Sequence, residues 1–185
     1  MPDAEELLHD QIDDLETLRM GATEDIREIY DKADPVRLAD PDDHEFDVAF
    51  FTVIKEVILE DMLAAHNVGA ETAETLTGDE LDEDIEGEEL EKAVEVMVHK
   101  LQNRVKAATD EIDEFVKVSQ VNGMSAETIV KSIERAMDVA AGVEGVVPVN
   151  GLDLVHLLNR IARDLVNSSM TAAARAGQIE VFRSG

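Results

Sequence analysis

A run of apolar residues that recur every three or four positions constrains the fold of this chain most strongly. From Leu90 to Phe115 these residues are spaced 4, 3, 4, 4, 3, 4 and 3 positions apart, which is the repeat of one helix face. The doubled four is a stutter, which locally straightens a coiled coil. The pattern predicts a helix over residues 88–122, of which about 32 residues would span roughly 48 Å. Such a length favours one arm of a helical hairpin, or a strut within a larger assembly.

Other segments carry helical patterns of the same kind. Residues 3–32 have a narrow apolar stripe suited to one partner helix, with Gly21 as a weak point where the helix could break. Residues 45–67 are apolar over much of their circumference. Ser125 is expected to cap a helix that runs to about Ala141. The last stretch, Leu152 to Gly185, is expected to form one long apolar helix followed by a short tail.

The low aromatic content decides what these helices use for a core. With one Tyr, five Phe and no Trp, the core must consist mainly of aliphatic side chains and Met, which suits helix packing against helix. We therefore predict an all-α fold, built as elongated helical hairpins or a bundle with long helices and with little or no β structure. The predicted parts are N-terminal helices (1–67), an acidic loop (68–87), the long helix (88–122) and a C-terminal helical region (123–185).

Charge is distributed unevenly along the chain. The chain has 43 acids against 16 Lys and Arg and a formal net charge of -27, yet residues 145–185 carry +1, which leaves -28 for residues 1–144. A carboxylate-rich surface repels itself in dilute salt, because the Debye length is about 10 Å at 0.1 M but only about 3 Å at 1 M. The composition is thus typical of a salt-adapted, haloarchaeal protein. The alternative is an acidic nucleic-acid mimic or a disordered acidic tail.

The chain carries no motif of a catalytic, cofactor or metal site. The absence of Cys excludes disulfides, thiolate zinc sites and cysteine nucleophiles. The acidic segment beginning at Asp82 resembles a calcium-binding loop as far as Gly87, but Ala93 stands where a bidentate Glu must close the site. The histidines lack the helical pairing of zinc ligands, and each is expected to be a surface or partly buried side chain. They are His9, His44, His66, His99 and His156. We expect no enzymatic activity and no cofactor.

Neither a membrane span nor a signal peptide is expected. No apolar run approaches the roughly 20 residues that a span requires. The N-terminus MPDAEELLHD is acidic, whereas a signal peptide begins with basic residues. We expect a protein that is made in the cytoplasm and has no membrane partner.

The C-terminal third resembles a family of viral proteins. GMSAETIVKSIERAM, a helix opened by Gly and Ser, precedes a loop and then a helix that contains RIAR and ends in GQIEVFRSG. Over residues 123–185 this order is similar to the minor head proteins of tailed viruses, the Mu F-like head morphogenesis group, which carry an Ile-Ala-Arg-Thr-Glu motif leading to a glycine. Three residues match the motif: Ile161, Ala162 and Arg163. Asp164-Leu165 replaces Thr-Glu, and Gly177 falls several residues late.

The resemblance implies a virion protein at the portal vertex and inner face of the capsid. The salt-adapted composition makes the host a haloarchaeon, in whose cytoplasm the protein would be made. Members commonly continue into a further domain, so this chain would be a processed or short form. The implied partners are the portal protein, the major capsid protein or both, with multiple copies in a symmetric assembly. Contact of the arginines with packaged DNA is less favoured, because the chain as a whole repels phosphates.

The neutral C-terminal helix is the predicted docking surface. Its interface residues are Leu154, Leu157, Leu158, Arg160, Ile161, Arg163, Leu165, Arg175, Phe182 and Arg183. We expect the arginines to pair with acids on the partner. Two alternatives stay open: a head-tail adaptor or scaffolding protein of such a virus, and a halophilic helical adaptor without any viral connection.

Overall fold

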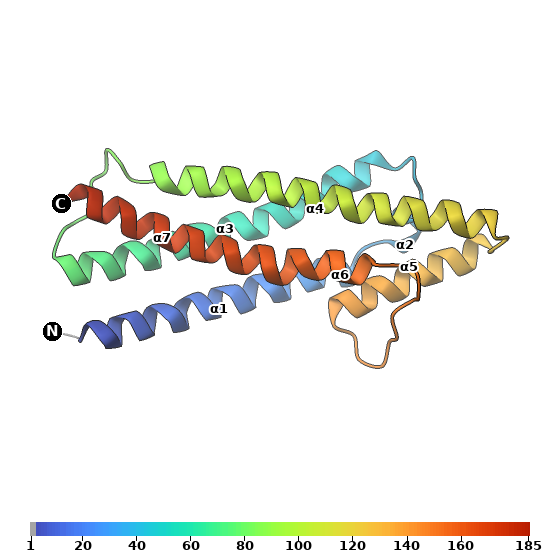
Figure 1. Cartoon of the computed structure of the whole chain (residues 1–185), viewed down its shortest axis with the longest axis horizontal. Helices are drawn as coiled ribbons and strands as arrows, with labels where there is room; N and C mark the ends of the chain where they lie inside the picture. The colour runs from blue at the N-terminus through green and yellow to red at the C-terminus, as the bar shows by residue number, and fades with distance from the viewer. Residues whose placement is uncertain (1–2) are drawn as a thin grey trace. The chain divides into compact units, whose positions relative to one another are not determined.

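The computed structural model describes residues 3–185, apart from the side chains of His44 and Phe46, and every regular element in this part of the chain is a helix (Figure 1). The expected surface position of the His44 side chain therefore lies outside the described residues. The α-helices are α1 (Ala4–Asp31), α2 (Pro35–Leu38), α3 (His44–Thr77), α4 (Glu88–Val121), α5 (Ala126–Ala141), α6 (Leu154–Asn159) and α7 (Val166–Ser184). A π-helix, Arg160–Leu165, joins α6 to α7. The predicted all-α class is confirmed, and α3 and α4 are both long, at 34 residues each.

Two predicted boundaries differ from the observed ones, and the possible break at Gly21 is not observed. α1 continues through Gly21 without a break. α3 extends past residue 67 to Thr77, so the first half of the predicted acidic loop is helical. It stays helical because Ala70 and Ala73 on this extension are buried in the core. The expected C-terminal tail is likewise wrong, since α7 reaches Ser184.

The described chain divides into two compact units, each assembled from segments that are distant in sequence. Unit 1 contains Met1–Thr23, Glu56–His99 and Leu165–Gly185, and unit 2 contains Glu24–Lys55 and Lys100–Asp164. A helix with a single apolar face cannot bury that face alone, so each unit gathers several helices around its own core. None of the helices in residues 3–185 is both long and apolar enough to cross a membrane.

In unit 1, α3 and α7 pack at very short range. A Cβ atom added to Gly69 of α3 would overlap the carbonyl oxygen of Ala174, and one added to Gly177 of α7 would overlap that of His66. Small residues at a crossing allow two helix backbones to approach each other, at the cost of helix propensity. The late glycine of the motif, Gly177, therefore has a packing role in this fold.

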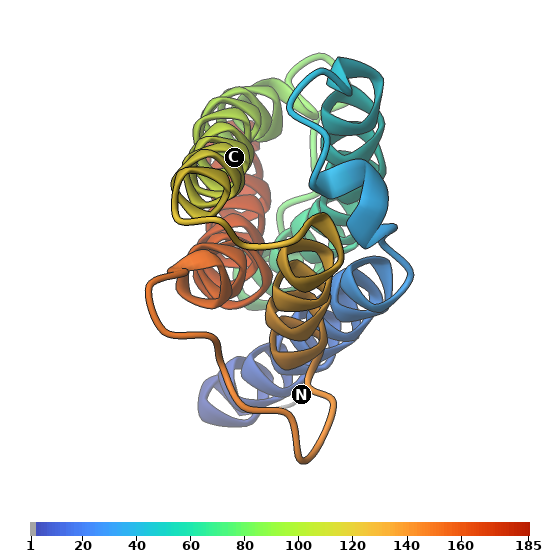
Figure 2. The same ribbon diagram turned by 90° about the vertical axis from the view of Figure 1, so that its right-hand side faces the viewer.

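In unit 2, α5 presents one buried face to its neighbours. Ser125 caps the helix, because its hydroxyl accepts a hydrogen bond from the backbone N–H of Thr128 at 3.2 Å. Gly142 ends it with a φ of 86°, a left-handed conformation that favours glycine. Both boundaries confirm the predicted helix. The long connection that follows leads to α6 (Figure 2). The buried face of α5 consists of Ile129, Ile133, Ala136, Met137 and Ala140.

Candidate functional site

A buried histidine and glutamate lie at the centre of unit 1. His66 of α3 and Glu180 of α7 are 1% and 0% exposed, and the ring Nε2 contacts the carboxylate Oε2. The expectation that His66 is a surface or partly buried side chain is wrong, because this partner stabilises it inside the core. No sequence pattern pointed to the pair, since 114 positions separate the two residues. The one available signal was an acid, Glu180, on a helix with few charges.

The second carboxylate oxygen of Glu180 contacts the backbone at the beginning of α4. Oε1 accepts the backbone N–H groups of Glu89 at 2.8 Å and Leu90 at 3.3 Å. The first N–H groups of a helix have no partner within the helix, and the helix dipole favours a negative charge at this end. Glu180 therefore acts as a cap that comes from a different helix.

The same contacts keep the carboxyl of Glu180 ionised. Burial raises its pKa, but the hydrogen bonds from His66 and from the backbone N–H groups of Gly87 and Glu89 lower it by more, and the pKa lies below its ordinary value of 4.5. A buried carboxylate with these three donors is compensated for its loss of water. The contacts described for Glu180 connect three helices, which is a structural role.

The acidic loop, residues 78–87, is attached to the end of α7 beside this pair. The hydroxyl of Ser184 accepts the backbone N–H of Asp82 at 2.9 Å, and Leu81 packs against a small apolar cluster of α3 and α7. Arg183 forms ion pairs with Glu88 at 2.9 Å and Glu89 at 3.4 Å. Among the side chains that the structure describes, which exclude that of His44, no group of three or more His, Asp or Glu is arranged to hold a metal ion.

The predicted docking residues fall into two classes. Four are core residues with at most 1% exposure: Leu154, Leu158, Ile161 and Leu165. Their assignment to a docking surface is corrected, because the apolar side chains that suggested a partner pack against helices of the chain itself. The others are half-buried or exposed: Leu157, Arg160, Arg163, Arg175, Phe182 and Arg183. Of these, Arg183 is already paired within the chain.

The residues that match the viral motif lie in the π-helix of unit 2. Side chains bind two carbonyl groups at its start: Tyr30 donates its hydroxyl to Leu158 O at 2.9 Å, and Arg104 donates Nη1 to Arg160 O at 2.6 Å. In a π-helix the backbone bonds shift from the i, i+4 to the i, i+5 pattern, so such donors help to satisfy carbonyls at the junction. π-Helical turns are frequent at functional sites.

The hydrogen bond between Arg104 and Arg160 brings together two stretches of the chain that contain no acidic residue. Residues 100–109 and 154–163 carry five Lys and Arg residues and no Asp or Glu. We define the cationic patch as Lys100, Arg104, Arg160 and Arg163. Partial burial and the neighbouring charge of Arg160 lower the pKa of Arg104, against the opposite effect of Asp164. Lys100, Arg160 and Arg163 are exposed, and the ion pairs found in residues 3–185 include none of them.

Fold and sites together define an all-α protein with an acidic exterior, a buried ionised cap in unit 1 and a cationic patch in unit 2. Neither a family model, nor a curated protein, nor a solved structure matches the chain. The residues of the chain itself therefore carry the argument about function.

Proposed function

We propose that the protein is a structural assembly protein of a haloarchaeal tailed virus, a minor head protein that docks to the portal protein or the major capsid protein through the cationic patch. The observation that carries the proposal is the set of exposed cations without an ion pair, in a chain of net charge -27. The resemblance of residues 123–185 to minor head proteins supports the viral class. The long helices suit a protein that builds an assembly.

An acidic protein surface is the partner that fits this patch best. In a chain with 43 acids, a carboxylate partner for each exposed arginine would be easy to supply. An exposed arginine without one is therefore available to a carboxylate of another protein. Arg160 and Arg163 are therefore suited to carboxylates on another protein, which arginine can bind through two parallel hydrogen bonds. At molar salt the Debye length is about 3 Å, so such a patch acts by direct contact and not by long-range attraction.

Burial narrows the docking surface relative to the one expected from the sequence. Leu158 and Ile161 belong to the core of the chain, whereas Arg160 and Arg163 are exposed. The surface that can reach a partner is thus polar and cationic. Polar interfaces of this kind depend on a few well-placed arginines.

The test is a virus that carries Arg160→Gln and Arg163→Gln in this gene. We expect the variant protein to fold normally and to be depleted from purified virions, as measured by quantitative mass spectrometry. The matched control is Lys131→Gln, which removes an exposed cation that already pairs with Glu127. Wild-type abundance of the double variant in virions argues against the patch. Absence of the wild-type protein from mature virions argues for a scaffold or a non-viral protein instead.

A further inference from the structure

The apolar stripe of α1 is buried along the second half of the helix and exposed along the first half. Its members recur at alternating spacings of four and three, so they lie on one face of the helix. Ala22 and Ile26 are fully buried, whereas Leu8 and Ile12 are 47% and 61% exposed. A seam of this kind is complete only when a second helix packs along it. Within residues 3–185 no helix covers Leu8 and Ile12.

One edge of this half of α1 contacts α7 inside unit 1. Gln178 of α7 donates its side-chain N–H to the amide oxygen of Gln11 at 3.0 Å, which fixes the two helices side by side. The other edge faces solvent and forms a surface hollow whose lining residues all belong to α1. We call its apolar residues, Ala4, Leu8 and Ile12, the open seam.

The open seam is bordered by carboxylates. Residues 3–20 contain seven acids and one Arg. Glu5 and Glu6 line the same hollow as Leu8, and the ion pairs found in residues 3–185 include neither of these two acids. A partner that covered the open seam would therefore meet a negative border.

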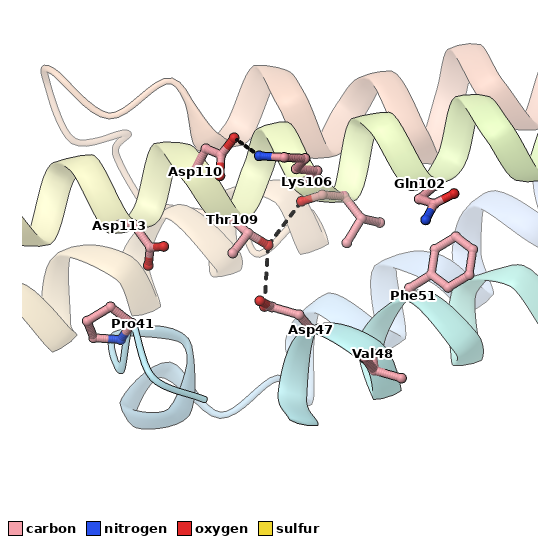
Figure 3. Close-up of a pocket in the computed structure, with 10 residues that line it drawn as sticks. Pro41, Asp47, Val48, Phe51, Gln102, Lys106, Thr109, Asp110 and Asp113 are labelled. Atoms are coloured by element: carbon pink, nitrogen blue, oxygen red, sulfur yellow. Dashed lines mark hydrogen bonds and ion pairs between the residues drawn. The ribbon is translucent and has the colours of Figure 1, made fainter. Parts of the chain in front are cut away.

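A second hollow, between α3 and α4 in unit 2, differs in this respect (Figure 3). The ammonium group of Lys106 lies 2.6 Å from Asp110, and Thr109 donates its hydroxyl to Asp47 at 3.3 Å. These charged groups are engaged within the chain. The carboxylates of Glu5 and Glu6 are the ones that a cationic partner can reach.

We propose that the open seam docks one amphipathic helix of a partner protein, with an apolar stripe that covers Leu8 and Ile12 and with Lys or Arg on its flanks. Helices recognise such seams through apolar residues at spacings of three and four. The basic flanks meet Glu5 and Glu6, which repel an acidic helix of the same shape. A second copy of α1 does not fit, because it would bring the seven acids of residues 3–20 against the same seven acids.

The proposal is independent of docking through the cationic patch, because the two surfaces share no residue and belong to different units. The test is an NMR titration of the full chain, at constant ionic strength, with a designed amphipathic peptide that has Leu at its seam positions and Lys on both flanks. We expect saturable shifts confined to α1 residues 4–19 and to the part of α7 near Gln178. The same stripe with Glu on its flanks should not bind.

Three outcomes of these measurements would overturn the proposal. Equally tight binding of a scrambled peptide with the Lys composition would show that net charge alone drives the interaction. Equally tight binding of the Glu-flanked peptide would show that the carboxylates select nothing. Sedimentation equilibrium of the free chain gives the third, a dimer that Ile12→Gln dissociates, because the occupant would then be a second copy.

Variants separate the open seam from the rest of α1. Ile12→Gln should weaken binding of the Lys-flanked peptide about fivefold or more, as for a contact residue of an interface. Met20→Gln is the matched control, since Met20 is 59% exposed on the same helix but lies outside the seam repeat, and it should leave binding unchanged. Equal effects of the two substitutions would contradict the proposal. Circular dichroism verifies that each variant is folded.

A second pair of variants tests the charged border. Glu5→Gln with Glu6→Gln should weaken binding of the Lys-flanked peptide about threefold, as for two exposed ion pairs. Glu24→Gln with Asp25→Asn removes the same charge from two exposed positions of α1 outside the hollow and should leave binding unchanged. Equal weakening by both double variants would mean that the peptide responds to the total charge of the chain.

Discussion

The imidazole of His66 and the carboxylate of Glu180 contact each other in the interior of unit 1, although 114 positions separate them along the chain. The same carboxylate accepts hydrogen bonds from the first N–H groups of α4, so one ionised group of α7 contacts both α3 and α4. Solvent reaches neither side chain of the pair, and their contacts within the protein must replace water.

Replacing Glu180 by Gln should destabilise the chain strongly. The amide keeps the shape of the side chain but removes the charge that His66 and the start of α4 contact. Leaving buried hydrogen-bonding groups without their charged partner costs about 1 to 3 kcal/mol or more. Urea unfolding followed by circular dichroism measures the loss. Glu127→Gln, at an exposed carboxylate that pairs with Lys131, is the control and should change stability little. Equal stability of the two variants would show that the buried pair contributes nothing.

Acid should remove the stability that the ionised carboxylate of Glu180 contributes to the folded chain. The folded-state pKa of this carboxyl lies below its ordinary value of 4.5, so the folded protein holds the proton less tightly than the unfolded chain does. The stabilisation is therefore complete above pH 4.5 and is lost as the pH falls through the lower, folded-state pKa. Unfolding curves of the wild type and Glu180→Gln, recorded at decreasing pH, should converge below pH 4.5. If the stability difference between the wild type and Glu180→Gln stayed constant into the acid range, the predicted direction of the pH dependence would be wrong.

Glycine-to-alanine substitutions should have opposite effects in α3 and in α1. Alanine favours a helix by about 1 kcal/mol over glycine. At Gly69 the new Cβ would overlap the backbone of Ala174, and overpacking of this kind costs about 1 to 3 kcal/mol, so Gly69→Ala should destabilise. At Gly21 a Cβ meets nothing within 4 Å, so Gly21→Ala should stabilise the chain. Thermal unfolding of both variants measures the two signs. Stabilisation by Gly69→Ala would mean that α3 and α7 are not in close contact.

Tyr30 should resist ionisation while the chain is folded. Its ring is fully buried and stacks on Phe50 with the ring centroids 5.9 Å apart, and its hydroxyl donates to Leu158 O. Burial raises the pKa of the hydroxyl well above its ordinary value of 10.0. The chain has one Tyr and no Trp, so the ultraviolet absorbance of tyrosinate reports this residue alone. On alkaline titration the tyrosinate signal should appear together with the loss of helix by circular dichroism. Its appearance near pH 10 in a helical chain would contradict the buried position.

Local patterns predicted the helices well, because helix formation depends on neighbours three and four positions away. The apolar repeat between Leu90 and Phe115 lies within α4, and the helix expected from the Ser125 cap to about Ala141 is α5. Periodicity could not distinguish a core face from a docking face. An apolar repeat of this kind fits both, and only the structure shows that the side chains of Leu158 and Ile161 are buried. The backbone beside them is contacted by residues as distant in sequence as Tyr30 and Arg104.

The sequence by itself determined the helical class, the acidic exterior and the near-neutral charge of residues 145–185, because composition and 3.6-residue periodicity are local properties. Tertiary structure alone decided which polar groups are buried. Gly69 and Gly177 allow α3 and α7 to approach each other, and the folded chain brings the start of α4 to the carboxylate of Glu180, which caps it. The energy of that arrangement depends on removing a charge from water next to its partners, and no stretch of sequence contains all of those partners.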